Sequence, residues 1–179
     1  MVYIFLADGF EEIEALTPYD VLKRANIEVK TVCVGKGLSV AGSHGIKVEA
    51  DINMDDVDLR TLDMAVLPGG MPGAANLDGS KKLGDILEYT VKNSKYAAAI
   101  CAAPMVLGKR GYLKGKKAVC YPGFEKYLDG AEICDTCVVR DGYFITAKGM
   151  GKALGFGLEL VSALKDKETA EKIRNSVFG

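Results

Sequence analysis

One of the five cysteines, Cys101, is surrounded by very small side chains. It lies in AAAICAAPMVLG, residues 97–108, where a buried strand is predicted to end and Pro104 suits the first turn of a helix. A thiol at the N-terminal end of a helix is favoured as the thiolate, which is the nucleophilic form of cysteine. A sharp strand-to-helix turn also excludes bulky neighbours, which accounts for the alanines. The alternative is that Cys101 is a small buried hydrophobic residue, as most free cysteines are.

An acidic segment, ADGFEEIEA at residues 7–15, follows the first apolar run of the chain. It contains three glutamates, Glu11, Glu12 and Glu14. A carboxyl group that faces a thiolate has a raised pKa, stays protonated and can donate a hydrogen bond to the sulfur atom. The other interpretation is an exposed glutamate in the first turn of a helix, which the helix dipole favours. We expect that simpler role for at least two of the three.

A glycine pair follows another apolar run, in LPGGMPGAAN at residues 67–76. Ligands of open α/β sheets bind outside the carboxyl ends of the strands, where this pair would meet the acidic segment and Cys101. We therefore expect backbone N–H groups of Gly69 and Gly70 to line one pocket with a carboxyl group and the thiol. The simpler interpretation of the pair is an ordinary turn. YPGF, residues 121–124, is predicted to follow a further strand at the same edge.

The elements that must position these residues alternate between strands and helices. Short apolar runs bounded by turn residues predict buried strands at residues 2–7, 28–34, 63–70, 96–101 and 117–121. Segments of helical period separate several of them, and Thr17, Pro18 and Asp20 are predicted to cap a helix ahead of VLKRA. This alternation implies an α/β fold, with a doubly wound, mostly parallel sheet and helices on both faces.

Two hairpins and a C-terminal helix complete the predicted fold. VVRDGYFIT, residues 138–146, places Asp141 and Gly142 between β-rich flanks, as a two-residue turn requires. LSVAGSHGIKVEA, residues 38–50, predicts a second antiparallel excursion at the sheet edge. ALGFGLELVSALK, residues 153–165, has the apolar spacing of a deeply packed helix. We find no internal repeat and no linker, and expect one domain over residues 1–179.

Composition and charge argue against several classes of function. The 23 Lys and Arg residues nearly balance the 24 Asp and Glu residues, and no run of like charges occurs, so we expect no nucleic-acid partner. The apolar stretches are shorter than the roughly 20 residues of a bilayer span, and no signal-peptide pattern is found. We therefore expect a cytoplasmic protein without membrane association. Neither a phosphate loop nor a correctly spaced dinucleotide fingerprint occurs, and we expect no cofactor.

The remaining cysteines and the single histidine give weaker signals. Cys134 and Cys137 form a C-x-x-C that leads into a hairpin instead of a helix, so it does not fit a redox motif, although oxidation could join the two thiols. A zinc site would need further ligands, but His44 is the only histidine and is expected at the surface, so we expect no metal. Cys33 and Cys120 lie in strand-like runs and are expected to be inert core residues.

Four segments together resemble the DJ-1/PfpI superfamily, and specifically its DJ-1 branch. They are LADGFEEIEALTPYDVLKRA, DMAVLPGGMPGAANL, AAAICAAPMVLG and ITAKGMGKALGFGLELV, which occur in the family's order over nearly the whole chain. The resemblance implies a flavodoxin-like fold, a homodimer, Cys101 as the reactive cysteine and Glu14 as the carboxyl group beside it. It also implies three sources of backbone N–H groups around the thiol, Gly69, Gly70 and Ala102.

The functions described for this superfamily follow from the resemblance alone. Members are described as oxidative-stress sensors whose cysteine becomes sulfinic acid, as glyoxalases or protein deglycases acting on methylglyoxal, and as chaperones. Older descriptions link relatives to thiazole monophosphate biosynthesis, and the PfpI branch to proteolysis.

Several positions depart from the family pattern or match it without a clear role. Ala102 replaces the histidine that follows the cysteine in PfpI-type members, which argues against protease activity. Tyr121 and Pro122 replace an HP pair near the pocket of the DJ-1 branch, and a tyrosine with an ordinary pKa near 10 cannot act as a general base at neutral pH. Asp20 matches a family aspartate that approaches the partner subunit's pocket, but we expect it to be the third residue of the helix cap.

Two main hypotheses about function follow. In the first, the Cys101 thiolate attacks a small 2-oxoaldehyde, or a thiol or amine modified by one, and Glu14 moves the proton that leads to a lactate-type product. In the second, the protein is a redox sensor or chaperone whose Cys101 becomes sulfinic acid, stabilised by Glu14 and backbone N–H groups. The absent histidine favours the second, and a relative without any activity is a third alternative.

Overall fold

The computed structural model describes all residues of the chain, 1–179, and is built around one seven-stranded sheet. In sheet order, its strands are β10 (Val138–Asp141), β11 (Phe144–Ala147), β7 (Tyr96–Ile100), β6 (Met64–Leu67), β1 (Val2–Leu6), β2 (Val29–Cys33) and β5 (Ile52–Asn53). Every neighbouring pair is parallel except β10 and β11. The predicted doubly wound, mostly parallel α/β fold is confirmed.

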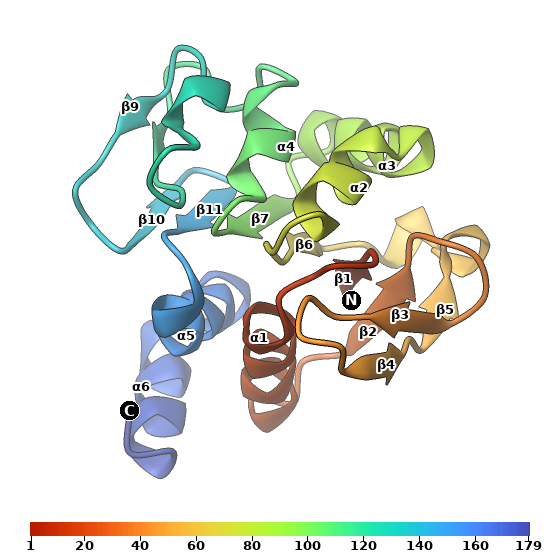
Figure 1. Ribbon diagram of the computed structural model, residues 1–179. Helices are drawn as coiled ribbons and strands as arrows, with labels where there is room; N and C mark the ends of the chain where they lie inside the picture. The colour runs from red at the N-terminus through yellow and green to blue at the C-terminus, as the bar shows by residue number, and fades with distance from the viewer.

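Helices cover both faces of the sheet (Figure 1). One face carries α1 (Glu12–Arg24), α5 (Ala153–Leu164) and α6 (Lys167–Ser176), and the other carries α2 (Gly73–Gly79), α3 (Lys81–Lys92) and α4 (Pro104–Gly108). Each face has its own cluster of 25 buried residues. Because successive side chains of a strand point to opposite faces, Ile4 of β1 enters one cluster and Phe5 enters the other. None of the helices is long and apolar enough to cross a bilayer.

Both predicted hairpins form. β3 (Ser39–Ala41) and β4 (Lys47–Glu49) make a separate antiparallel pair, while β10 and β11 extend the main sheet. The pairing of Asp141 with Phe144 places the second turn at Gly142 and Tyr143, one residue later than predicted. Gly142 has a φ of +60°, a left-handed conformation that glycine adopts without a steric penalty. The four short 3₁₀ helices are η1 (Met54–Asp56), η2 (Leu59–Thr61), η3 (Glu125–Tyr127) and η4 (Met150–Lys152).

The strand predicted at residues 117–121 is wrong as a member of the main sheet. Only β8 (Lys117–Ala118) is a strand, and it pairs with β9 (Glu132–Ile133) in a sheet of its own. The next residue, Val119, donates its N–H to the side-chain hydroxyl of Thr146 at 2.9 Å, not to a strand backbone. The apolar run therefore reflects burial, because a buried irregular segment is as apolar as a buried strand.

The helix cap predicted at residues 17–20 is also wrong, because α1 already begins at Glu12. Glu11 is the N-cap, and its Oε2 accepts a hydrogen bond from the Glu14 N–H at 2.8 Å. Pro18 lies inside the helix, where it removes one backbone hydrogen bond. Asp20 lies in the helix interior and forms an ion pair with Arg24 at 2.6 Å. Tertiary packing of α1 against α5 outweighs the local cost of the proline.

The packing of α1 on α5 depends on Gly157, and this can be tested by substitution. A Cβ atom there would lie 3.1 Å from Val21 Cβ and 3.2 Å from the backbone Cα of Pro18. We predict that Gly157→Leu lowers the free energy of unfolding by about 1–3 kcal/mol through overpacking. In α3, a Cβ at Gly84 would meet only Arg110, at 3.6 Å, so Gly84→Leu is the matched control and should be neutral or stabilising by up to about 1 kcal/mol. Urea unfolding measures the free energy of unfolding of both variants, and an equal change in the two would contradict the prediction.

Candidate active site

The candidate site lies at the carboxyl ends of β1, β6 and β7, where the winding of the sheet reverses. β1 is followed by α1 on one face, whereas its neighbour β6 is followed by α2 on the other face (Figure 1). The segments after these strands separate there and leave room for a site, which is the general position of ligands in open α/β sheets. The thiol, the acidic segment and the glycine pair each follow one of these three strands.

Cys101 occupies a strained turn between β7 and α4. Its φ is +65°, which is uncommon for a residue with a Cβ atom and costs on the order of 1–3 kcal/mol. Two backbone hydrogen bonds hold the turn: Cys101 donates its N–H to the carbonyl of Ala147 at 2.9 Å, and its own carbonyl accepts from the N–H of Tyr121 at 2.8 Å. The side chain is half-buried. The predicted sharp turn from a strand into a helix that starts at Pro104 is confirmed.

Glu14 lies in the first turn of α1, is 1% exposed, and interacts with the thiol of Cys101. Its Oε2 accepts a hydrogen bond from the N–H of Gly69 at 3.0 Å, while its Oε1 is buried and has no hydrogen-bond partner. A Cβ atom at Gly69 would lie 2.5 Å from Glu14 Oε2 and 2.6 Å from Cys101 Cβ. Glycine is required at this position because any side chain would separate the carboxyl group from the thiol.

The acid–base properties of the two groups are coupled. Burial raises the pKa of Glu14 to about 7, and the nearby charge of Glu11 acts in the same direction. Burial and the Glu14 carboxylate raise the pKa of Cys101 to about 12. The prediction that a helix N-terminus would favour the thiolate is therefore wrong, because burial and the facing carboxylate both disfavour the charged sulfur. Between about pH 7 and 12, Glu14 and Cys101 together retain one proton, and the thiolate is present when that proton resides on Glu14.

Backbone N–H groups reach the thiol from two sides. Those of Gly70 and Ala102 act on the sulfur atom to lower its pKa. Gly70 has a φ of +87°, and a Cβ atom there would lie 2.5 Å from the N atom of Glu11, so this position also requires glycine. The N–H of Gly69, expected to face the thiol, is bonded to Glu14 instead.

Three further residues were expected near the site, and only Tyr121 lies beside it. The ring of Tyr121 is about half exposed and lies beside Gly149, where a Cβ atom would be 3.4 Å from Tyr121 Cδ2 and 3.9 Å from Glu14 Oε1. Pro122 instead lines a neighbouring surface hollow of about 260 Å³ together with Cys120 and Cys134. Asp20 contacts Arg24 on α1 and is not the helix cap.

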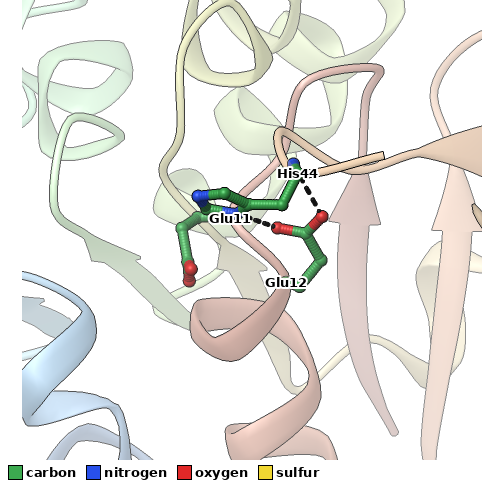
Figure 2. A group of neighbouring side chains, drawn as sticks. All are labelled: Glu11, Glu12 and His44. Atoms are coloured by element: carbon green, nitrogen blue, oxygen red, sulfur yellow. Dashed lines mark hydrogen bonds and ion pairs between the residues drawn. The ribbon is translucent and has the colours of Figure 1, made fainter. Parts of the chain in front are cut away.

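Glu12 is buried and forms hydrogen bonds with the turn of the β3–β4 hairpin, which the sequence did not predict (Figure 2). It is 3% exposed, so two of the three glutamates are buried, and the expectation that at least two of them are exposed is wrong because of Glu12. Its Oε1 accepts from the backbone N–H of His44 at 2.8 Å, and its Oε2 lies 2.8 Å from His44 Nδ1 and accepts from the Ser43 hydroxyl at 3.2 Å. These bonds tie the turn of the β3–β4 hairpin to the start of α1.

The hydrogen bonds of Glu12 with His44 also bring together the one group of residues that has the spacing of metal ligands. Oxygen atoms of Glu11 and Glu12 and a ring nitrogen of His44 lie within 4.8 Å of one another. Both oxygens of Glu12, however, already accept hydrogen bonds from the hairpin. Burial alone would raise the pKa of Glu12, but hydrogen bonds from His44 and Ser43 outweigh it and lower the pKa to about 2.

The four other cysteines lie in different environments. Cys33 and Cys120 are buried, as expected, and burial raises the pKa of both, that of Cys120 to about 11. Cys134 and Cys137 are half-buried free thiols in the segment between β9 and β10. Only Cys101 combines partial exposure with a buried carboxyl group and a left-handed backbone.

Comparison with known proteins places the chain in a family. The profile described as DJ-1/PfpI family matches residues 1–163. The chain belongs to the DJ-1/PfpI family. It is 35% identical over 177 residues to protein dj-1beta of Drosophila melanogaster, covering 98% of this chain and 95% of that protein. It is 37% identical over 168 residues to protein DJ-1 homolog B of Arabidopsis thaliana, covering 93% of this chain but 38% of that longer protein.

Two further similarities concern a named activity and a solved structure. A protein of Pyrococcus abyssi named a deglycase is 32% identical over 167 residues, with 92% of this chain and 99% of that protein covered. The solved structure of oxidised DJ-1 of Toxoplasma gondii superposes with a TM-score of 0.95 at 36% identity, covering 99% of this chain and 97% of that one. The DJ-1 family fold therefore extends over the whole chain.

The opposite pKa shifts of two carboxyl groups in one helical turn predict opposite effects of pH on stability. The pKa of Glu14 is raised in the folded protein, so its contribution is fully present below about pH 4.5 and is lost as the pH rises to about 7, by on the order of 3 kcal/mol. The pKa of Glu12 is lowered, so its contribution is present above about pH 4.5 and is lost as the pH falls towards 2.

Urea unfolding of wild type, Glu14→Gln and Glu12→Gln between pH 3 and 8 measures these contributions. Glu14→Gln should abolish the loss of stability between pH 4.5 and 7, whereas Glu12→Gln should leave the range from about pH 4.5 to 6 unchanged and weaken the dependence below pH 4.5. Above about pH 6.5, Glu12→Gln should also change the dependence, because Glu12 raises the pKa of His44 from its ordinary 6.5. If Glu14→Gln has the wild-type pH dependence between pH 4.5 and 7, the raised pKa of Glu14 is refuted.

Proposed function

We propose that this DJ-1 family protein is a cofactor-independent enzyme of the glyoxalase or deglycase type, which uses Cys101 to attack small 2-oxoaldehydes. The observation that carries the proposal is a partly exposed thiol beside a buried carboxyl group whose pKa is about 7. A general acid–base group works best when its pKa lies near the operating pH. The deglycase name of the Pyrococcus abyssi relative supports the same class of substrate.

Glu14 can replace the base that a histidine would otherwise supply. As the sulfur of Cys101 bonds to the aldehyde carbon C1, the thiol proton passes to the Glu14 carboxylate, and Glu14 then protonates the C1 oxygen. The product is a neutral hemithioacetal, and Glu14 is again a carboxylate. The N–H groups of Gly70 and Ala102 stabilise negative charge on the sulfur before attack.

The same carboxylate can complete the isomerisation. Glu14 removes the proton from C1, and the electron pair forms a C1–C2 enediolate with the negative charge on the C2 oxygen. Glu14 then returns the proton to C2, while the C1 hydroxyl gives its proton to the C2 oxygen and becomes a carbonyl. The resulting thioester is hydrolysed by water, which breaks the carbon–sulfur bond and releases a 2-hydroxy acid and the thiol. For methylglyoxal the net reaction is addition of one water to give lactate. Oxidant, metal and cofactor are not consumed in these steps.

The proposal predicts how turnover of methylglyoxal depends on the two groups. Cys101→Ser should abolish cysteine-dependent lactate production, and Glu14→Gln should reduce kcat by roughly 10²–10⁴-fold because it removes the proton carrier. Cys134→Ser, which removes a half-buried thiol outside the site, is the matched control and should retain wild-type turnover. Lactate is measured enzymatically with all four proteins at pH 7. Equal lactate production by wild type and Cys101→Ser would refute the enzymatic function.

A second candidate, a redox sensor, is favoured by one specific observation. The buried Oε1 of Glu14 has no partner, and N–H groups of Gly70 and Ala102 face the sulfur, so the site has donors for oxygen atoms added to Cys101 when Glu14 is protonated. Two equivalents of a peroxide would convert the thiol to sulfenic and then sulfinic acid, releasing two waters or alcohols. The solved Toxoplasma gondii relative is described as oxidised.

Mass spectrometry after peroxide treatment tests the sensor hypothesis. We predict that the Cys101 peptide gains two oxygens before peptides with Cys134 or Cys137 are modified, because only its site supplies donors to the added oxygens. Glu14→Leu should leave Cys101 more readily oxidised to the three-oxygen state, since the carboxyl donor to the sulfinate is lost and leucine supplies no replacement. If Cys134 or Cys137 is oxidised first in the wild type, Cys101 is not the sensor.

A further inference from the structure

The unpartnered oxygen of Glu14 points to a second part of the site, next to the thiol. Glu14 is 1% exposed, and a carboxylate oxygen buried without a partner is costly unless something that binds there supplies one. A Cβ atom at Gly149 would lie 3.9 Å from Oε1. The same position lies 3.4 Å from Cδ2 and 3.9 Å from Cε2 of the Tyr121 ring. The oxygen and the ring therefore both face the position that Gly149, lacking a side chain, leaves unfilled.

The Tyr121 ring is held in place but not covered. Its backbone N–H binds the carbonyl of Cys101 at 2.8 Å, so the ring position is coupled to the turn that carries the thiol. The ring of Phe124 packs edge-to-face against the Tyr121 ring, with ring centroids 6.5 Å apart and an interplanar angle of 80°. The side chain is nevertheless 51% exposed, and its hydroxyl group forms no hydrogen bond within the chain. A rigid, half-exposed aromatic ring beside a reactive group is a surface on which an apolar group can pack.

Two methionines directly follow glycines of the site in the chain. Met71 directly follows Gly70, and Met150 directly follows Gly149, and each side chain is about half exposed. Exposed methionine is adaptable and makes favourable contacts with aromatic groups.

We propose that Tyr121 is a specificity-determining residue whose ring, with Gly149, forms a subsite for the carbon substituent of the 2-oxoaldehyde and selects aromatic substituents. The inference rests on the proposed function and names the substrate class of that same site. With C1 bonded to Cys101 and Glu14 positioned to move a proton between C1 and C2, the substituent on C2 extends from the carboxyl group towards the ring. An aryl group gains stacking there that a methyl group cannot gain.

The test compares phenylglyoxal with methylglyoxal as substrates. We expect the ratio of kcat/KM values, phenylglyoxal over methylglyoxal, to fall about tenfold in Tyr121→Ala, mainly through KM for phenylglyoxal. Tyr121→Phe retains the ring and should restore the ratio to within about twofold of wild type. Tyr143→Ala removes a tyrosine of similar exposure in the β10–β11 turn and is the matched control. Thermal unfolding of each variant excludes a loss of folded protein.

The outcomes separate this inference from the proposed function. A lower ratio in Tyr121→Ala, restored in Tyr121→Phe and unchanged in Tyr143→Ala, supports the subsite. Turnover of both substrates with the same ratio in wild type and Tyr121→Ala overturns the subsite and leaves the enzymatic function intact. Absence of Cys101-dependent turnover of either substrate by the wild type overturns the proposed function and the subsite with it.

Discussion

The interaction on which the site depends is the contact between the buried carboxyl group of Glu14 and the thiol of Cys101. Removing a carboxylate from water disfavours its charged form, and the single N–H that Gly69 donates does not offset that cost. Near neutral pH, Glu14 is therefore partly protonated, whereas an exposed glutamate would be ionised. In the proposed reaction, this proton allows Glu14 to serve as acid and base for Cys101 without a histidine.

The rest of the local structure keeps these two groups in contact. Gly69 must lack a side chain because its Cβ position is already occupied by both partners, and Cys101 must adopt a left-handed backbone to point its thiol at the carboxyl group. Both features cost stability, through backbone entropy at glycine and through strain at cysteine. The two large clusters of buried residues on the faces of the sheet supply the stability that this arrangement requires.

Two carboxyl groups separated by one residue in α1 have opposite roles because of their partners. Glu12 is as buried as Glu14, yet hydrogen bonds from Ser43 and His44 stabilise its charged form and tie the β3–β4 hairpin to the helix. Glu14 has an oxygen without any partner and is held near its neutral form. The contrast shows that hydrogen bonding decides whether a buried glutamate supports the structure or is available for proton transfer.

Local patterns in the sequence determined the fold class, the two hairpins, the strand-to-helix turn at Cys101 and the presence of a glycine pair beside it. These features follow from apolar periodicity, turn residues and chain order, which are properties of neighbouring residues. The family motifs pointed to Glu14, but periodicity could not distinguish it from Glu12. The cap proposed at residues 17–20 was wrong because the packing of α1 on α5 carries the helix through Pro18.

Only the tertiary structure decided which glutamate is charged, that Cys101 has a raised pKa, that the segment at 117–121 leaves the sheet and that Tyr121 faces the same space as Glu14. Each of these depends on burial and on partners that lie far apart in the sequence, because the electrostatic environment of a side chain is set by the residues packed around it.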